Sequence, residues 1–207
     1  MHIADGVLST PLLAAGAAVA VIGCGLGLRR IAPERIPQVA LVSSVLFVAA
    51  LVHFPVGPSS VHLVLSGLAG VMLGWAAFPA IVVALLLQAV MFGFGGLTVL
   101  GVNAVNMAVP AVLCGLLFEA VRRRGNHRLT LVAAAAAGGG SVLLGALLTT
   151  LSIRLGAPQF GDSVWLVVAT ALPVAVVEAV FTAAAVGLML KVRPEALEAP
   201  QLVFSHA

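Results

Sequence analysis

Two histidines, one at the start of the chain and one at the end of a Pro- and Gly-containing stretch, have the types and spacing to bind a metal ion. The chain begins MHIADGVLS, so His2 directly follows Met1. The α-amine of Met1, the amide nitrogen of His2 and the His2 imidazole can close small chelate rings around one ion in a plane. One in-plane position then remains for a fourth nitrogen, and a square plane of nitrogens is typical of Ni(II) or Cu(II).

His62 is the candidate for the fourth nitrogen. It ends the stretch HFPVGPSSVH, in which Pro55, Gly57 and Pro58 predict a rigid, non-helical loop. Imidazole also suits Co(II), whereas Mg(II) and Ca(II) prefer oxygen ligands, which this set lacks. His53 begins the same stretch. It is either a residue that an incoming ion meets first or an ordinary histidine at the membrane surface.

The composition places these residues on a membrane protein. Of the 207 residues, 62% are hydrophobic and 8% are charged, whereas an ordinary soluble domain has about 25% charged residues. The net charge of +3 is small, and we assign it to membrane topology rather than to nucleic-acid binding. We predict an all-α, multi-pass protein of the cell (inner) membrane, with one transmembrane domain over residues 1–207.

Within that domain, we assign residues 1–10 to a metal-binding N-terminus and residues 53–62 to an outer loop of the metal site. The first ten residues lack the basic start and short apolar core of a secretory signal peptide. We therefore expect Met1 to remain in the mature protein.

The apolar stretches predict a bundle of about seven membrane-spanning helices, because a span needs about 17–25 apolar residues. The expected segments are Pro11–Leu28, Pro37–Phe54, His62–Gly74, Trp75–Phe94, Leu97–Val121, Leu129–Leu151 and Val164–Leu190. The third is too short to cross squarely, since its length is only about 20 Å. It is either tilted or partly inside the protein.

The basic residues orient this bundle. In a seven-span topology, nine of the ten fall on one side: Arg29, Arg30, Arg35, Arg122, Arg123, Arg124, Arg128, Lys191 and Arg193. The positive-inside rule makes that side cytoplasmic. We therefore expect the N-terminus outside and the C-terminus inside, which puts His2 and His62 on the same, outer side.

Polar residues inside the apolar segments are expected to face the protein interior. Gln88, Asn103 and Asn106 lie toward the predicted outer half, and either support the metal site through hydrogen bonds or simply join helices. Ser60 is a further candidate for such support. For Glu178 three roles stay open: a hydrogen-bond acceptor behind the metal ligands, a partner of Arg154, or a protonated acid in the core.

Small residues recur at a spacing of four, which lets membrane helices approach closely. The pairs are Ala14/Ala18, Gly23/Gly27 and Gly70/Gly74. They serve either packing within the bundle or docking of another membrane subunit. The run Gly138–Gly140, midway through the sixth segment, predicts a flexible or closely packed point.

Several stretches resemble the CbiM/NikM family, the substrate-binding (S) components of energy-coupling-factor cobalt and nickel importers. The stretches are MHIADGVLS, FPVGPSSVHLVLSGLAGVMLGWAAFPA and LLLQAVMFGFGGLTVLGVNAVNMA, with a weaker match at VVEAVFTA. The sequence departs from the family pattern at Phe94, where an acidic residue is frequent, and at His53, where Asn is common.

The resemblance implies a helical bundle, often of seven spans, that binds Ni(II) or Co(II) as its transported substrate. It implies the same metal ligands: the Met1 amine, the His2 amide and imidazole, and the His62 imidazole. The implied partners are a transmembrane coupling subunit, two ATP-binding-cassette ATPase subunits and often a small accessory membrane protein, all at the lipid bilayer. This sequence itself has no ATP-binding GxxxxGK[ST] motif.

Other functions remain as alternatives. A stand-alone secondary transporter of a cation or small molecule would predict broken helices and internal repeats, and no convincing repeat is visible. An intramembrane enzyme would use His62, Glu178 and Ser60, but HExxH and GxSxG motifs are missing, so we expect no enzyme activity. A vitamin-binding S component would not need a free Met-His terminus.

Overall fold

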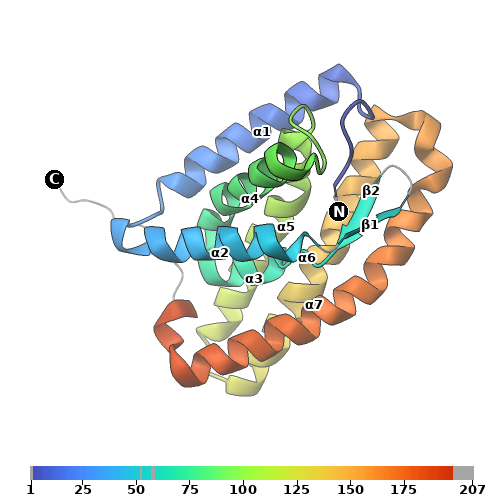
Figure 1. Ribbon diagram of the computed structural model, residues 1–207. Coiled ribbons are helices and arrows are strands. Elements are labelled where there is room, and N and C mark those ends of the chain that lie inside the picture. The colour runs from blue at the N-terminus through green and yellow to red at the C-terminus, as the bar shows by residue number, and fades with distance from the viewer. Residues whose placement is uncertain (1, 52, 57–58, 198–207) are drawn as a thin grey trace.

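The structure, a computed structural model, is a bundle of helices with one short β-hairpin (Figure 1). It describes residues 2–51, 53–56 and 59–197, and the side chains of 53–56, 59–62 and 161–164 are outside that description. The helices are α1 (Thr10–Leu28), α2 (Ile36–Ala49), α3 (Ser66–Leu73), α4 (Ala77–Phe92), α5 (Leu100–Arg122), α6 (His127–Gly156) and α7 (Val164–Val192). Short 3₁₀ helices lie at Pro33–Arg35, Gly74–Ala76, Pro158–Ser163 and Pro194–Leu197.

Local sequence explains several helix ends. The side chain of Asn126 accepts a hydrogen bond from Leu129 N–H at 3.1 Å and so caps the start of α6. Gly93 ends α4 in the left-handed conformation, with φ of 69°. Helix α2 ends at Ala49, short of the predicted Phe54, because the chain turns into strand β1 (His53–Val56), where Pro55 disfavours a helix.

Glycines set how closely the helices pack. A Cβ atom at Gly23 would lie 2.5 Å from the Phe78 ring, and one at Gly67 would lie 2.5 Å from the carbonyl oxygen of Ala137. A Cβ at Gly138 would lie 2.5 Å from the carbonyl oxygen of Glu178. The Gly138–Gly140 run is therefore a point of close packing, where α3 and α7 approach α6.

The spaced small residues differ in burial. Gly23 and Gly27 are buried against α4 and the turn before it, and Gly70 is buried against Ala111 of α5. These serve packing within the bundle. Ala14 and Ala18 are exposed on α1.

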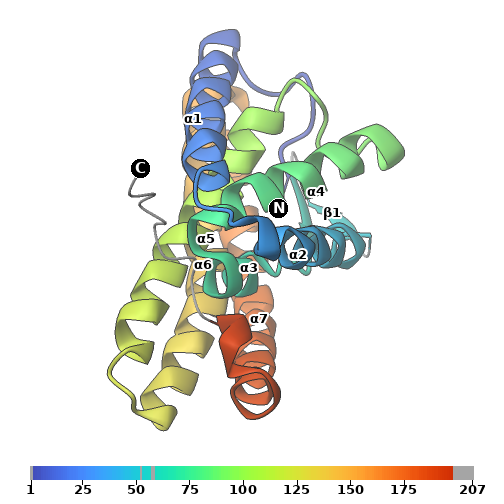
Figure 2. The same ribbon diagram turned by 90° about the vertical axis from the view of Figure 1, so that its left-hand side faces the viewer.

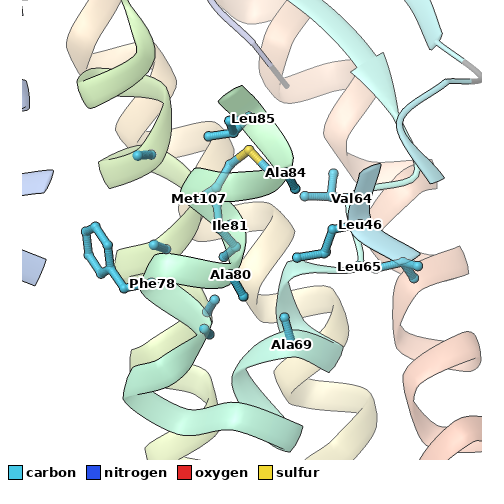
Figure 3. Packing of buried hydrophobic residues seen from close by; sticks show 14 of the residues in the cluster. Leu46, Val64, Leu65, Ala69, Phe78, Ala80, Ile81, Ala84, Leu85 and Met107 are labelled. Carbon is cyan, nitrogen blue, oxygen red and sulfur yellow. The ribbon is translucent and has the colours of Figure 1, made fainter. Parts of the chain in front are cut away.

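The main hydrophobic core draws on all seven helices, and α3, α4 and α5 together supply half of its buried residues. Figure 3 shows Met107 of α5 and Ile81 and Ala84 of α4 packed near Leu46 of α2 and Val64. Many of the most buried positions are alanines, so the helix backbones approach closely. Helix α3 is buried at every residue, which agrees with the prediction that the third segment lies partly inside the protein.

Each predicted segment overlaps one of the seven α-helices, and the all-helical fold class is confirmed. Within the described residues, five helical stretches are long and apolar enough to cross a membrane: Thr10–Leu28, Ser66–Phe92, Leu100–Arg122, His127–Gly156 and Trp165–Val192. The third and fourth predicted segments form one of these stretches. Helix α2 has 14 residues, which is about 21 Å and less than the ~30 Å of a bilayer core. The count of seven spans and the orientation stay predictions.

Candidate metal centre

The segment before α1 enters the interior of the bundle. His2 is 4% exposed and Ile3 is fully buried. Ile3 N–H donates to Asn103 Oδ1 at 2.9 Å, and Asn103 Nδ2 donates to the Ile3 carbonyl oxygen at 2.9 Å. One side-chain amide of α5 thus satisfies both backbone groups of Ile3, in the way that a neighbouring β-strand would. This pair of bonds fixes the backbone directly after His2.

Asp5 fastens the same segment to the start of α5. Its Oδ1 accepts hydrogen bonds from Thr98 N–H at 3.1 Å, Thr98 Oγ1 at 2.5 Å and Val99 N–H at 3.3 Å. Asp5 N–H donates to the Gly95 carbonyl oxygen at 2.8 Å. A carboxylate at a helix N-terminus is stabilised by the free N–H groups and by the helix dipole. Asp5 therefore anchors the N-terminal segment from the opposite end to Asn103.

The loop between α4 and α5 is shaped to receive this segment. Gly95 and Gly96 have φ of 76° and 128°, a conformation that favours glycine. A Cβ atom at Gly96 would overlap the Asp5 carboxylate, and one at Gly95 would lie 3.1 Å from Asn103 Nδ2 and 3.5 Å from the His2 Cβ. The sequence GFGGLT thus provides the space in which His2 and Asp5 lie.

The second predicted ligand belongs to the hairpin. Strand β1 pairs antiparallel with β2 (Ser59–His62), with the backbone of His53 opposite that of His62 and Pro55 opposite Ser60. In Figures 1 and 2, the dark blue segment before α1 runs toward this hairpin. Met1 and the side chains of His53, Ser60 and His62 lie outside the described residues, so the predicted coordination stays a prediction.

Glu178 of α7 holds the segment that follows His62. Its side chain is fully buried, and Oε1 accepts hydrogen bonds from Val64 N–H at 2.5 Å and Leu65 N–H at 2.6 Å. Leu65 has φ of 52°, a left-handed conformation that costs a non-glycine residue about 1–2 kcal/mol. Among the described ion pairs none joins Glu178 to Arg154, and a role of Glu178 behind a metal ligand stays a prediction.

The remaining polar candidates make hydrogen bonds between helices. Gln88 Nε2 donates to the Leu46 carbonyl oxygen at 3.4 Å and so joins α4 to α2. Asn106 Oδ1 accepts from Ser152 Oγ at 3.2 Å, which joins α5 to α6. Both are interhelical hydrogen bonds, the second of their two predicted uses. Over the described part of the chain, no three His, Cys, Asp or Glu side chains gather as a metal cluster.

The role of Asp5 as an anchor is not apparent from the sequence. Two sequence features take part in this anchor. One is an aspartate near the start of the chain, and the other is a glycine-rich turn followed by Thr98 close to the start of a helix. Because the two features lie about 90 residues apart, the sequence does not indicate that they meet.

The chain is similar to known metal transport proteins in sequence. Residues 2–196 match the family model CbiM, described as the cobalt uptake substrate-specific transmembrane region. A putative metal transport protein of Haemophilus influenzae is 42% identical over 200 residues, which cover 95% of this chain and 97% of that protein. A fused nickel transport protein NikMN of Rhodobacter capsulatus is 40% identical over 131 residues, which cover 60% of this chain and 38% of that protein.

A crystal structure of a transition metal transporter has the same fold, with a TM-score of 0.82, 23% sequence identity and coverage of 93% of both chains. The relatives are metal transport membrane proteins and not enzymes, which removes the intramembrane-enzyme alternative. The chain belongs to the CbiM/NikM family and is a membrane component of cobalt or nickel transport.

Proposed function

We propose that this chain is the substrate-capture subunit of an ATP-driven importer of Ni(II) or Co(II) of the energy-coupling-factor type. The ion is its transported substrate. The proposed ligands are the α-amine of Met1, the amide nitrogen and imidazole of His2, and the imidazole of His62. These nitrogens suit Ni(II) and Co(II) better than they suit hard divalent cations.

The observation that carries the proposal is the fixed, buried backbone at Ile3. The two hydrogen bonds with Asn103 hold the chain at the residue after His2, and His2 itself is 4% exposed. A chelate that uses consecutive backbone nitrogens needs one backbone conformation, and ordering it in advance lowers the entropic cost of binding. Asp5 supports the same conformation from its bonds with Thr98 and Val99.

Glu178 supports the second half of the proposed site. By accepting from Val64 and Leu65, it fixes the chain two residues after His62. Hydrogen-bonding groups behind metal ligands commonly affect metal affinity by 10–100-fold. Two separate anchors, on α5 and α7, would therefore hold the two halves of one site.

Import requires partners under this proposal: a transmembrane coupling subunit and two ATP-binding-cassette ATPases, to which transporters of this type often add a small accessory membrane protein. The fused relative NikMN supports a multi-component transporter by its name. ATP hydrolysis in the partners would release the ion by moving the N-terminal segment or the hairpin out of coordination geometry.

Calorimetric titration of Ni(II) and Co(II) into purified protein with an untagged N-terminus tests the site. We expect one ion per chain, and loss of binding in His2→Ala, in His62→Ala and in a protein with a residue added before Met1. His127→Ala is the matched control, because His127 lies at the start of α6 and is exposed. Binding that survives both histidine substitutions contradicts the proposed ligands.

Uptake into proteoliposomes tests the transport class. We expect ATP-dependent metal uptake only when the coupling and ATPase subunits are present with this chain. Uptake by this chain alone, driven by an ion gradient, would instead support a stand-alone secondary transporter.

A further inference from the structure

An apolar groove of about 570 Å³ lies between α2, α4 and the end of α1. Its wall includes Leu28, Ile31, Val39, Ser43, Pro79 and Val83. The two serines at the groove do not make it polar: Ser43 Oγ donates to the Val39 carbonyl oxygen at 2.9 Å, and Ser44 Oγ donates to the Ala40 carbonyl oxygen at 3.0 Å. The groove therefore suits an apolar chain.

Three arginines are next in sequence to residues that line one end of this groove. Leu28 and Ile31 flank Arg29 and Arg30, and Ile36 of the groove wall directly follows Arg35. Glu34 is the single acidic residue between Leu28 and Ile36, so the rim keeps an excess of positive charge. None of the described ion pairs involves these three arginines.

We call Arg29, Arg30 and Arg35 the arginine rim, and their contacts are typical of the membrane–water interface. The Arg30 guanidinium lies 4.9 Å from the centroid of the Trp75 ring, and Arg35 Nη1 donates to Gln38 Oε1 at 3.2 Å. Arg29 is exposed. Tryptophan and arginine are typical of the level of lipid headgroups, and basic pockets between membrane helices bind anionic headgroups.

We propose that this groove binds an anionic phospholipid, with an acyl chain between α2 and α4 and the phosphate at Arg29 and Arg35. The argument is charge complementarity. An apolar groove alone would accept any lipid tail, but the arginine rim favours a lipid with a net negative headgroup. This site is separate from the proposed metal ligands and is independent of which ion is transported.

Trp75 supplies the probe. The chain has two tryptophans, so Trp165→Phe leaves Trp75 as the only one. Trp75 lies four residues before Pro79 of the groove wall, and its carbonyl oxygen and the Pro79 ring both lie beside Gly27. We therefore expect a lipid with brominated acyl chains in the groove to quench Trp75 fluorescence.

The experiment compares brominated phosphatidylglycerol with brominated phosphatidylcholine, at equal mole fraction, in bilayers that contain Trp165→Phe protein. We expect stronger quenching by phosphatidylglycerol. Each of Arg29→Gln and Arg35→Gln should lower the relative affinity for phosphatidylglycerol by about five-fold, because one arginine near a lipid surface contributes that much. Arg124→Gln removes the same charge from the α5–α6 turn and should change nothing.

A groove-filling variant separates the groove from the surrounding bilayer. Ala40 is exposed and lines the groove, so Ala40→Phe should reduce quenching by both lipids. Equal quenching by the two lipids, or a phosphatidylglycerol preference that survives Arg29→Gln with Arg35→Gln, would overturn the proposal. The groove would then be open to a partner helix or to lipid of any charge.

Discussion

Ile3 and Asn103, 100 residues apart in the chain, exchange two hydrogen bonds of 2.9 Å in the interior of the bundle. Both backbone groups of Ile3 are buried and would lose these two bonds if the Asn103 amide were removed. A buried polar group left without a partner costs about 1–3 kcal/mol. The pair therefore joins the start of the chain to α5. Its loss should also disorder the backbone directly after His2.

Replacement of Asn103 by Ala should weaken Ni(II) or Co(II) binding by about 10–100-fold, the range typical of residues that support metal ligands. Asn103→Asp keeps the acceptor for Ile3 N–H and, with its buried carboxyl group protonated, also a donor to the Ile3 carbonyl, so it should have a smaller effect. Calorimetric titration measures both. Asn106→Ala is the matched control, since Asn106 contacts Ser152 and not the N-terminal segment. Equal losses in Asn103→Ala and Asn106→Ala would show that only general stability had changed.

Gly96→Ala should displace Asp5 and weaken metal binding. The new methyl group would overlap the Asp5 carboxylate, and the φ of 128° is unfavourable for alanine. Exposure of the N-terminal segment should rise, as measured by limited proteolysis of the purified protein. Gly25→Ala in α1 is the control, because a Cβ atom added there would meet nothing within 4 Å. Normal metal binding by Gly96→Ala would argue against the Asp5 anchor.

Glu178→Ala should lower both thermal stability and metal affinity. It leaves the N–H groups of Val64 and Leu65 without their acceptor, at a position where Leu65 already has an unfavourable backbone conformation. Glu178→Gln retains one acceptor oxygen and should be milder in both measurements. Thermal unfolding and metal titration on the same samples test this.

Glu119→Gln is the control for removing a carboxylate. Glu119 pairs with Arg122 and Arg123 at the end of α5 and does not contact the hairpin. We expect it to leave metal affinity unchanged. A Glu178→Ala protein that loses stability but keeps its metal affinity would restrict Glu178 to a structural role.

The sequence predicted the helical segments well because hydropathy identifies long apolar stretches without knowledge of their neighbours. Intramembrane Asn103 and Glu178 could also be recognised as interior residues, since polar groups rarely face lipid. Their partners could not be recognised. Ile3 and Asn103 meet only after folding, and a leucine with positive φ at residue 65 leaves no local sequence signal.

The α6 helix offers a direct test of the predicted orientation. Arg124 lies in the turn before this helix and Arg154 lies near its end, and both are exposed. A helix of 30 residues is about 45 Å long, which exceeds the ~30 Å bilayer core. If α6 spans the membrane, the two arginines must lie on opposite sides.

In a protein with Cys24 and Cys114 replaced by Ala, we expect Arg154→Cys to react with a membrane-impermeant thiol reagent in intact cells. Arg124→Cys should react only after the cells are permeabilised. The physical reason is the positive-inside rule, which assigns the α5–α6 turn to the cytoplasm because four arginines lie in it or directly beside it. The reverse pattern would put the N-terminal segment and the hairpin on the cytoplasmic side, where they could not capture an ion from outside.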